Sequence, residues 1–189
     1  MGAVGERPGR GPRAYVAFLR GLNMGGRRVI AMADLRAAFA SLGIGSARTI
    51  LASGNVVFES PHGNAAPLAR DIQRGLKSSA GLDVEVILRP LSRIREIVAE
   101  DPFAAIKLTS ETRLCVTFLR DASVQARTFT AESPEGDMRS WGLSAGEVAS
   151  VFILSPKRGT PDLMRNNEKK FGRAITTRSW STIVKIARS

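Results

Sequence analysis

The residues best suited to chemistry gather in two short segments of the first third of the chain. The segment from Arg20 to Arg28 is rich in glycine, amide and guanidinium groups, and Ser53 to Asn55 adds a hydroxyl, a glycine and a second amide. Such groups hold phosphate or carboxylate, and neither segment contains an acid. The sequence therefore predicts a site for an anionic ligand formed by Arg20, Asn23, Gly25, Gly26, Arg27, Arg28, Ser53, Gly54 and Asn55.

These residues also have a structural interpretation. Glycine permits left-handed backbone conformations, asparagine satisfies the backbone of turns, and arginine pairs with acids from elsewhere in the chain. The segment Gly21 to Gly26 lacks the Lys-Ser/Thr pair of a P-loop, and the next predicted helix begins several residues later than in a dinucleotide fingerprint. A nucleotide is thus compatible with the segment but is not indicated by it.

Groups that would support catalysis are scarce. The single histidine, His62, lies in a Pro-His-Gly turn, which favours a solvent-facing residue over a general base. Cys115 lies in an apolar run with no histidine nearby in the chain, so we expect a core position and no disulfide. No Cys/His cluster has the spacing of metal ligands. We predict no catalytic residue, metal or cofactor, and an enzyme acting on a phosphorylated small molecule is only an alternative.

Composition indicates an ordinary globular protein. The 189 residues are 43% apolar and 24% charged, and no apolar run approaches the ~18 residues that a membrane span needs. Residues 1–13, rich in glycine, proline and arginine, are expected to be a disordered lead-in without a signal or an anchor. A single cysteine cannot form an intramolecular disulfide, so the expected location is the reducing cytoplasm. We expect a monomer.

Positive charge is concentrated towards the end of the chain. There are 28 basic and 17 acidic residues, for a net charge of +11. Nine of the basic residues and two of the acidic ones follow position 156, so this stretch alone contributes +7. The alternative function is therefore electrostatic binding of nucleic acid. Its candidate residues are Arg165, Lys169, Lys170, Arg173, Arg178 and Lys185.

A repeated pentapeptide predicts two copies of one fold. Val16-Ala17-Phe18-Leu19-Arg20 returns 100 positions later as Val116-Thr117-Phe118-Leu119-Arg120. Around the first copy, apolar periodicity and turn residues predict a strand at 14–19, a helix ending at Gly43, a hairpin joining 48–51 to 55–59, a helix from Asn64 to Gly81 and a strand at 84–88. This β-α-β-β-α-β order is that of the ferredoxin-like motif, with two helices on one face of an antiparallel sheet.

The second half repeats the pattern less clearly. We expect strands at 114–119, 137–142, 147–154 and 174–177, a weak helix at 122–129 and a helix at 162–171. A final amphipathic helix beginning near Trp180 is interpreted as an addition to the repeat. The predicted fold is α+β, with ferredoxin-like units at 14–90 and 112–178, a connecting helix and linker at 91–111, and a C-terminal helix at 179–189. The first strand is apolar on both faces, so its second face should be covered rather than available to RNA.

Three motifs together resemble a known bacterial family, domain of unknown function 1697. They are the strings from Tyr15 to Arg28, from Met32 to Leu35 and from Ser53 to Phe58. Residues 177–185 are similar to the C-terminal signature of that family, with Ser179 and Ser181 at positions where asparagine is expected. The resemblance implies a two-lobed α+β fold, and it supplies no activity, substrate or catalytic residue.

The predicted topology brings the two candidate segments together. In a β-α-β-β-α-β unit, the exit of the first strand and the hairpin between the second and third strands lie at the same end of the sheet. We therefore expect the segment that begins at Arg20 to lie beside Ser53, Gly54 and Asn55.

Overall fold

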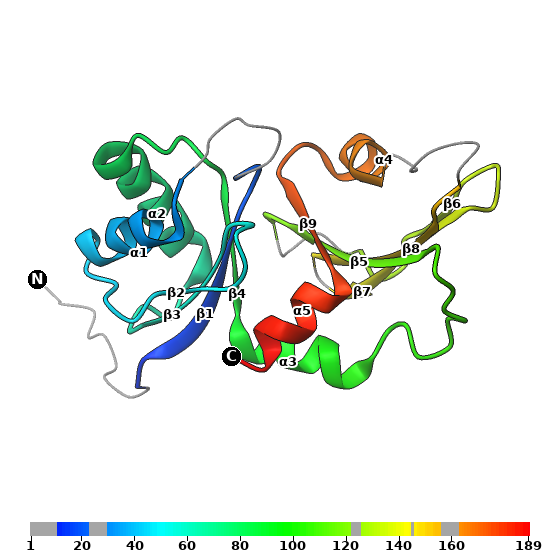
Figure 1. The fold of residues 1–189 in the computed structure, drawn as a ribbon, viewed down its shortest axis with the longest axis horizontal. Helices are drawn as coiled ribbons and strands as arrows, with labels where there is room; N and C mark the ends of the chain where they lie inside the picture. Colours follow the sequence, from blue (N-terminus) through cyan, green and yellow to red (C-terminus); the bar gives the residue numbers. More distant parts are fainter. Residues whose placement is uncertain (1–10, 23–29, 122–125, 145, 156–162) are drawn as a thin grey trace, which may run out of the picture.

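The computed structural model describes residues 11–22, 30–121, 126–144, 146–155 and 163–189. These residues form nine strands and five helices, arranged as two lobes that lie side by side (Figure 1). Each lobe contains one antiparallel sheet, with strand orders β2-β3-β1-β4 and β6-β7-β8-β5-β9. The structure is therefore of the mixed α and β kind that the sequence predicts.

The first lobe has the predicted succession of elements: β1 (Arg13–Leu19), α1 (Met32–Ser41), β2 (Arg48–Thr49), β3 (Asn55–Ser60), α2 (Ala65–Ala80) and β4 (Val86–Pro90). The second strand is shorter than expected because Leu51 adopts a left-handed conformation with φ of 59°, which no strand can continue through. Helix α2 has both predicted ends. The Asn64 side chain caps it by accepting from the Ala66 amide at 3.1 Å, and Gly81 closes it in the left-handed region.

The second lobe contains β5 (Thr112–Leu119), β6 (Thr130–Glu132), β7 (Met138–Ser144), β8 (Glu147–Ile153), α4 (Leu163–Phe171) and β9 (Ile175–Ser179). Of the weak helix predicted at 122–129, residues 122–125 lie outside the described residues, and residues 126–129 form a turn closed by the Phe129 amide on the Ala126 carbonyl. The helix prediction is wrong in that part because the turn packs directly on β7. The edge strand β6 was not predicted.

In each lobe the last strand runs directly into a helix. Helix α3 (Leu91–Glu100) follows β4, and α5 (Trp180–Ala187) follows β9. The two helices pack against each other below the two sheets in the view of Figure 1. Their buried side chains join those from the inner faces of both sheets in one hydrophobic core, which covers the second face of β1 as expected. Each of the two helices therefore continues the last strand of its sheet and helps to close the core between the sheets.

No helix among the described residues is long and apolar enough to cross a membrane.

Gly142 in β7 is a position where a side chain has no room. A Cβ atom there would lie 1.6 Å from the Ala126 carbonyl oxygen, which is backbone and cannot rotate away. We expect Gly142→Ala to lower the free energy of unfolding by more than about 2 kcal/mol, because overpacking against backbone forces the turn off the sheet. Gly45→Ala is the control, since a Cβ there meets nothing within 4 Å. Urea denaturation of both variants checks this, and equal stabilities would contradict it.

Candidate functional site: the seam between the lobes

The lobes meet at a pair of stacked aromatic rings. Phe18 of β1 and Phe118 of β5, which are equivalent positions of the repeated pentapeptide, have ring centroids 4.4 Å apart and planes inclined by only 16°. Both side chains are fully buried. We use the word seam for this junction together with the polar groups that surround the two rings.

One arginine crosses the seam from the first lobe to the second. Arg89 lies on β4 opposite Val16, and its guanidinium lies over the ring of Phe118. Its Nε donates to Glu147 at 2.6 Å, and its Nη2 donates to the carbonyl of Leu119 at 2.6 Å. The side chains of Arg89 and Glu147 are only 6% and 2% exposed. The positive charge of this arginine is therefore neutralised inside the protein.

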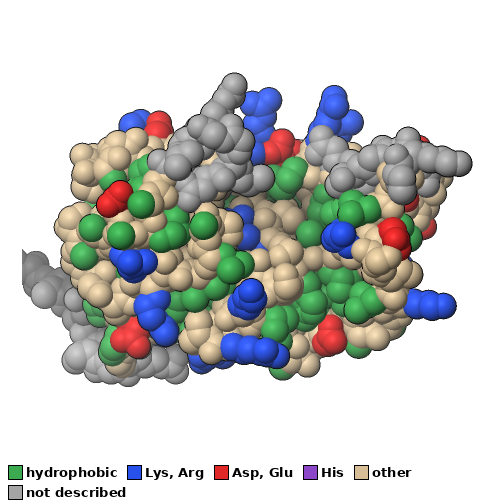
Figure 2. Space-filling view, in the orientation of Figure 1, with side chains coloured by type: hydrophobic (Ala, Val, Ile, Leu, Met, Phe, Trp, Pro, Cys, Tyr) green, Lys and Arg blue, Asp and Glu red, His purple; other side chains and the backbone are tan. Residues whose placement is uncertain are grey.

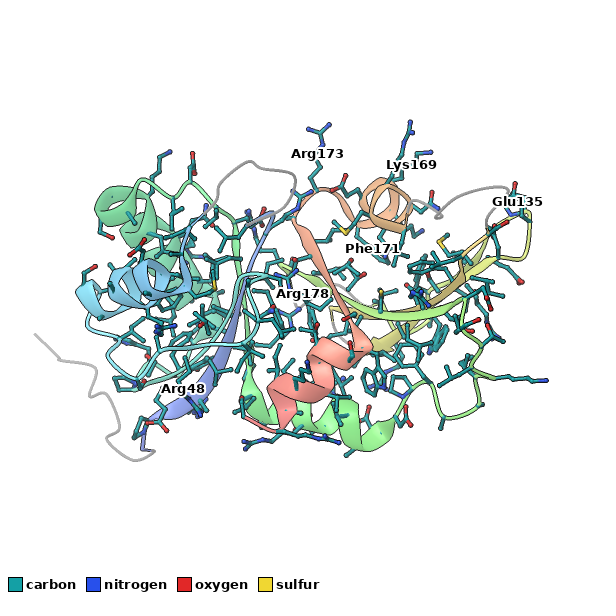
Figure 3. The ribbon with its side chains drawn as sticks, in the orientation of Figure 1. Arg48, Glu135, Lys169, Phe171, Arg173 and Arg178 are labelled. Carbon is teal, nitrogen blue, oxygen red and sulfur yellow. The ribbon has the colours of Figure 1, made fainter. Side chains whose placement is uncertain are left out.

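A second arginine crosses in the opposite direction. Arg178 lies on β9 opposite Val116, over the ring of Phe18, and appears between the lobes in Figure 3. Its Nε donates to the Asn55 amide oxygen at 2.6 Å, and its Nη2 donates to the Leu19 carbonyl at 3.0 Å. The hydrogen bonds of Arg178 resemble those of Arg89. The difference is that Nε of Arg178 donates to the Asn55 amide, whereas Nε of Arg89 donates to the Glu147 carboxylate.

The environment of Arg178 contains neutral acceptors. Its remaining hydrogen bonds go to the hydroxyl of Thr176 and the carbonyl of Thr177, and within the described part of the chain it forms no ion pair. Burial lowers the pKa of Arg178 to about 10, so the group still carries its charge at neutral pH. Figure 2 shows Lys and Arg side chains along the junction of the lobes on this face. Among the described residues, Arg178 is therefore a positive charge at the seam to which no acidic side chain supplies a counter-charge.

The structure places the end of β1 beside the predicted hairpin. The Leu19 amide donates to the Gly54 carbonyl at 2.8 Å, as the topology predicts. Gly54 has φ of 72°, and a Cβ there would lie 3.0 Å from the Leu19 carbonyl oxygen, so this close approach requires glycine. Arg20 forms an ion pair with Glu168 of α4, across the seam. The predicted site residues Asn23, Gly25, Gly26, Arg27 and Arg28 lie outside the described residues.

The side chain of Asn55 is fully occupied within the protein. It is buried, and its amide nitrogen donates to the Ile50 carbonyl and to the Ser53 hydroxyl, both at 3.0 Å. Its oxygen accepts from Arg178. Asn55 thus holds the hairpin and orients the guanidinium, while the half-exposed Ser53 lies at the outer end of this chain of hydrogen bonds.

The six cationic residues proposed for nucleic acid do not share one surface. Arg165, Lys169, Lys170 and Arg173 are exposed on α4 and just after it, and Figure 3 shows Lys169 and Arg173 pointing away from the protein. Arg178 lies in the seam, and Lys185 is exposed on α5. The structure therefore leaves four of the six as a single basic surface.

Other potentially reactive groups have structural surroundings. Burial raises the pKa of the Cys115 thiol to about 11, so the thiol is protonated at neutral pH and is a poor nucleophile. His62 is exposed, and its backbone carbonyl accepts from the Tyr15 hydroxyl at 2.8 Å. The described residues contain no group of three or more His, Cys, Asp or Glu side chains that could hold a metal ion.

Sequence reasoning missed Arg89 and Glu147 as a pair. The available signal was Arg89 itself, a charged residue that directly follows the apolar run Val86 to Leu88 in a predicted strand. Charged residues are almost never fully buried unless they are paired, so this position could have indicated a partner. Nothing near Glu147 in the chain identifies it as that partner, because the two residues are 58 positions apart.

The fold and the seam define a two-lobed α+β protein whose lobes are held together by arginines that cross in both directions. The chain belongs to the family described as protein of unknown function (DUF1697), whose model matches residues 13–148. That match ends before residues 177–185, so it does not include the C-terminal part of the resemblance. In the structure, Ser179 caps α5 by accepting from the Thr182 amide.

A solved structure supports the same fold. The chain is similar to the conserved bacterial protein SP0830 from Streptococcus pneumoniae, with a TM-score of 0.67 and 19% sequence identity. The similarity covers 94% of this chain and 98% of that one. Among curated proteins, no significant match is found.

Proposed function

We propose that this protein binds a small anionic ligand, carrying phosphate or carboxylate, at the seam beside Arg178, Ser53 and Asn55. The observation that carries the proposal is the contrast between the two crossing arginines. Arg89 is neutralised by Glu147, whereas the described residues give Arg178 only neutral oxygens. Partly removing a guanidinium from water without a counter-charge costs free energy, which a bound anion would offset.

Arg20 and the segment that follows it extend this proposed site. The ion pair of Arg20 with Glu168 is partly exposed, with side chains 31% and 26% accessible. Partly exposed ion pairs contribute little to stability, so a ligand with several negative charges can replace Glu168 at Arg20. In this proposal the ligand lies between the two arginines, against the hairpin and the residues from Asn23 to Arg28.

The test uses four anions: inorganic phosphate, pyrophosphate, ATP and citrate. A rise in the midpoint of thermal unfolding reports stabilisation of the folded protein, and calorimetric titration gives the Kd of each anion. A ligand at a hundred times its Kd stabilises the folded state by about 2.7 kcal/mol. We expect this effect for at least one of these anions with the parent protein and its loss in Arg178→Gln. Arg74→Gln is the matched control, because that side chain is 80% exposed on α2.

A second variant keeps Arg178 and changes its partner instead, and circular dichroism must show both variants to be folded, because Asn55 also donates to the Ile50 carbonyl. Asn55→Asp places a carboxylate beside Arg178, as Glu147 stands beside Arg89, and should therefore abolish anion binding. If both variants bind every tested anion as tightly as the parent protein does, the seam is not the site. If no anion stabilises the parent protein, the proposal is also wrong.

Nucleic acid is a second candidate ligand, favoured by the exposed basic surface of α4 and the turn after it. Electrostatic binding predicts that the logarithm of affinity falls with the logarithm of salt concentration, with a slope of about −0.9 for each phosphate contacted on duplex DNA. Fluorescence anisotropy with a labelled duplex tests this. The double variant Lys169→Glu, Lys170→Glu should reduce the slope, and a flat salt response of the parent protein would exclude this function.

We also propose that the two lobes are tandem copies of one ferredoxin-like unit. The Leu19 amide donates to Gly54, and the Leu119 amide donates to Gly146 at the same 2.8 Å. Each unit would extend beyond the predicted boundaries of 14–90 and 112–178 to include the helix that follows, α3 or α5. Separate polypeptides divided within 101–111 should then associate when produced together, because one hydrophobic core spans both. Two halves that fold independently and do not associate would contradict this proposal.

A further inference from the structure

Glu168 is the one acidic residue of α4, a helix that the structure describes in full, and its side chain reaches into the seam. The other charged residues of this helix are Arg165, Lys169 and Lys170. Lys169 points away from the protein in Figure 3, whereas the Glu168 carboxylate accepts from the guanidinium of Arg20, at the end of β1 in the other lobe. A single carboxylate therefore extends from a basic helix to an arginine of the proposed anion site.

Contacts other than this ion pair hold α4 on its sheet. The side chain of Asn167 is buried, and its amide nitrogen donates to the Thr117 hydroxyl at 3.0 Å. At the end of the helix, the rings of Phe171 and Phe129 meet edge to face with their centroids 4.8 Å apart. The ion pair of Glu168 is partly exposed, and such pairs contribute little to stability. The helix therefore does not depend on Glu168 to stay in place.

Arg20, the partner of Glu168, lies on the same side of β1 as Arg178. Arg178 lies over the Phe18 ring and donates to the Leu19 carbonyl, which directly precedes Arg20 in the chain. Successive side chains of a strand point to opposite faces, so Arg20 shares the face of Phe18. Two neighbouring guanidinium groups are therefore available to one ligand, and Glu168 occupies one of them.

A second acid near Arg20 is already engaged by the other lobe. Glu85 lies across the ladder from Arg20, and its carbonyl accepts from the Arg20 amide at 2.9 Å. Its carboxylate, however, pairs with Arg120, the residue that ends the second copy of the pentapeptide. Among the described residues, Glu168 is therefore the acid that a ligand at Arg20 has to displace.

We propose that Glu168 is the specificity-determining residue of the anion site at the seam, an inference that rests on the proposed function. A carboxylate attached to the protein competes for Arg20 at a high effective concentration, so a free anion with one anionic group does not displace it. A ligand already anchored at Arg178 presents its second anionic group at a similarly high effective concentration. Glu168 therefore restricts the subsite at Arg20 to ligands that carry two anionic groups.

The test follows the side-chain Nε–H signals of Arg20 and Arg178 by NMR, because each signal reports one of the two subsites. The probes are inorganic phosphate, with one anionic group, and pyrophosphate, with two. In the parent protein, phosphate should shift the Arg178 signal alone, and pyrophosphate should shift both signals. In Glu168→Gln, phosphate should also shift the Arg20 signal. Pyrophosphate should bind this variant about tenfold more tightly, because it no longer has to displace a carboxylate.

Glu132→Gln is the matched control. It removes the same charge from an exposed side chain on β6, the edge strand at the opposite end of the second sheet from β9. Both arginine signals should respond in this variant as they do in the parent protein. An equal gain in affinity for pyrophosphate in Glu132→Gln and Glu168→Gln would mean that only the overall charge of the protein matters, and would overturn the role of Glu168.

The outcomes for the parent protein separate this inference from the proposed function. If neither anion shifts the Arg178 signal, the anion site is absent and both proposals are wrong. If phosphate shifts both signals, or if pyrophosphate shifts the Arg178 signal without that of Arg20, the anion site stands and the role of Glu168 is wrong. These outcomes require no variant, so poor folding of Glu168→Gln would not protect the inference from contradiction.

Discussion

Replacing Glu147 with glutamine is expected to lower the free energy of unfolding by about 3–5 kcal/mol, because it leaves a buried guanidinium without its counter-charge. Glu147 accepts from Arg89 at 2.6 Å and lies 3.4 Å from Arg93, and its own side chain is 2% exposed. Urea denaturation measures the change, and an unchanged dependence on urea would show that compactness is retained. A loss of this size is a large part of the stability of an ordinary domain.

A double substitution separates burial from pairing. Replacing both partners, as Arg89→Met with Glu147→Leu, should recover most of the stability, since apolar residues of similar volume need no counter-charge. Glu96→Gln is the control, because that carboxylate also contacts Arg93 but is 58% exposed and should contribute less than about 1 kcal/mol. If Glu147→Gln lowers the free energy of unfolding no more than Glu96→Gln does, the ion pair of Arg89 and Glu147 is not desolvated.

Replacing Phe118 with alanine is expected to lower stability by about 3–5 kcal/mol, because the ring is fully buried between the lobes and its removal leaves a cavity. The ring stacks on Phe18 and also lies beneath Arg89, 5.8 Å from that guanidinium. Removing the Phe118 ring should therefore weaken the packing between the two lobes as well as the packing within the second lobe. Chemical denaturation gives the magnitude.

A double-mutant cycle tests whether the two rings act together. The double variant Phe18→Ala, Phe118→Ala should lose less free energy of unfolding than the sum of the two single losses. The difference should be about 0.5–1.5 kcal/mol for a stacked pair. Phe39 is the control, because it packs against Phe58 in the core of the first lobe and makes no ring contact with Phe118. Phe39→Ala with Phe118→Ala should be additive. Additivity for both pairs would mean that the stack contributes nothing beyond burial.

Most helices and strands of the first lobe could be predicted from the sequence, because the residues that determine each of them lie close together in the chain. Asn64 and Gly81 mark the ends of α2 by chemistry that acts within one turn, and Leu68, Ile72 and Leu76 define its buried face by spacing alone. The turn at 126–129 was predicted as a helix because its apolar spacing is weak and a close contact with Gly142, far along the chain, decides its conformation. Local patterns do not encode such contacts.

In the candidate site, too, some features follow from neighbouring residues and others depend on contacts between distant ones. The succession of elements predicts that the exit of the first strand lies beside the hairpin, and the Leu19 amide donates to the Gly54 carbonyl there, whereas Asn23 to Arg28 of the predicted segment lie outside the described residues. It assigned Arg178 to a surface for nucleic acid, because a count of charges cannot tell which arginine loses its contact with water. The partners of Arg178, Asn55 and Leu19, are 123 and 159 positions away in the chain.

By itself, the sequence determined the succession of helices and strands in the first lobe and the family to which the chain belongs, because periodicity, caps and motifs are properties of neighbouring residues. Only the tertiary structure decided how the lobes meet and which of the two crossing arginines has no acidic partner in the part of the chain that the structure describes. The physical reason is that desolvation and charge pairing depend on distances between residues that folding, and not chain order, brings together.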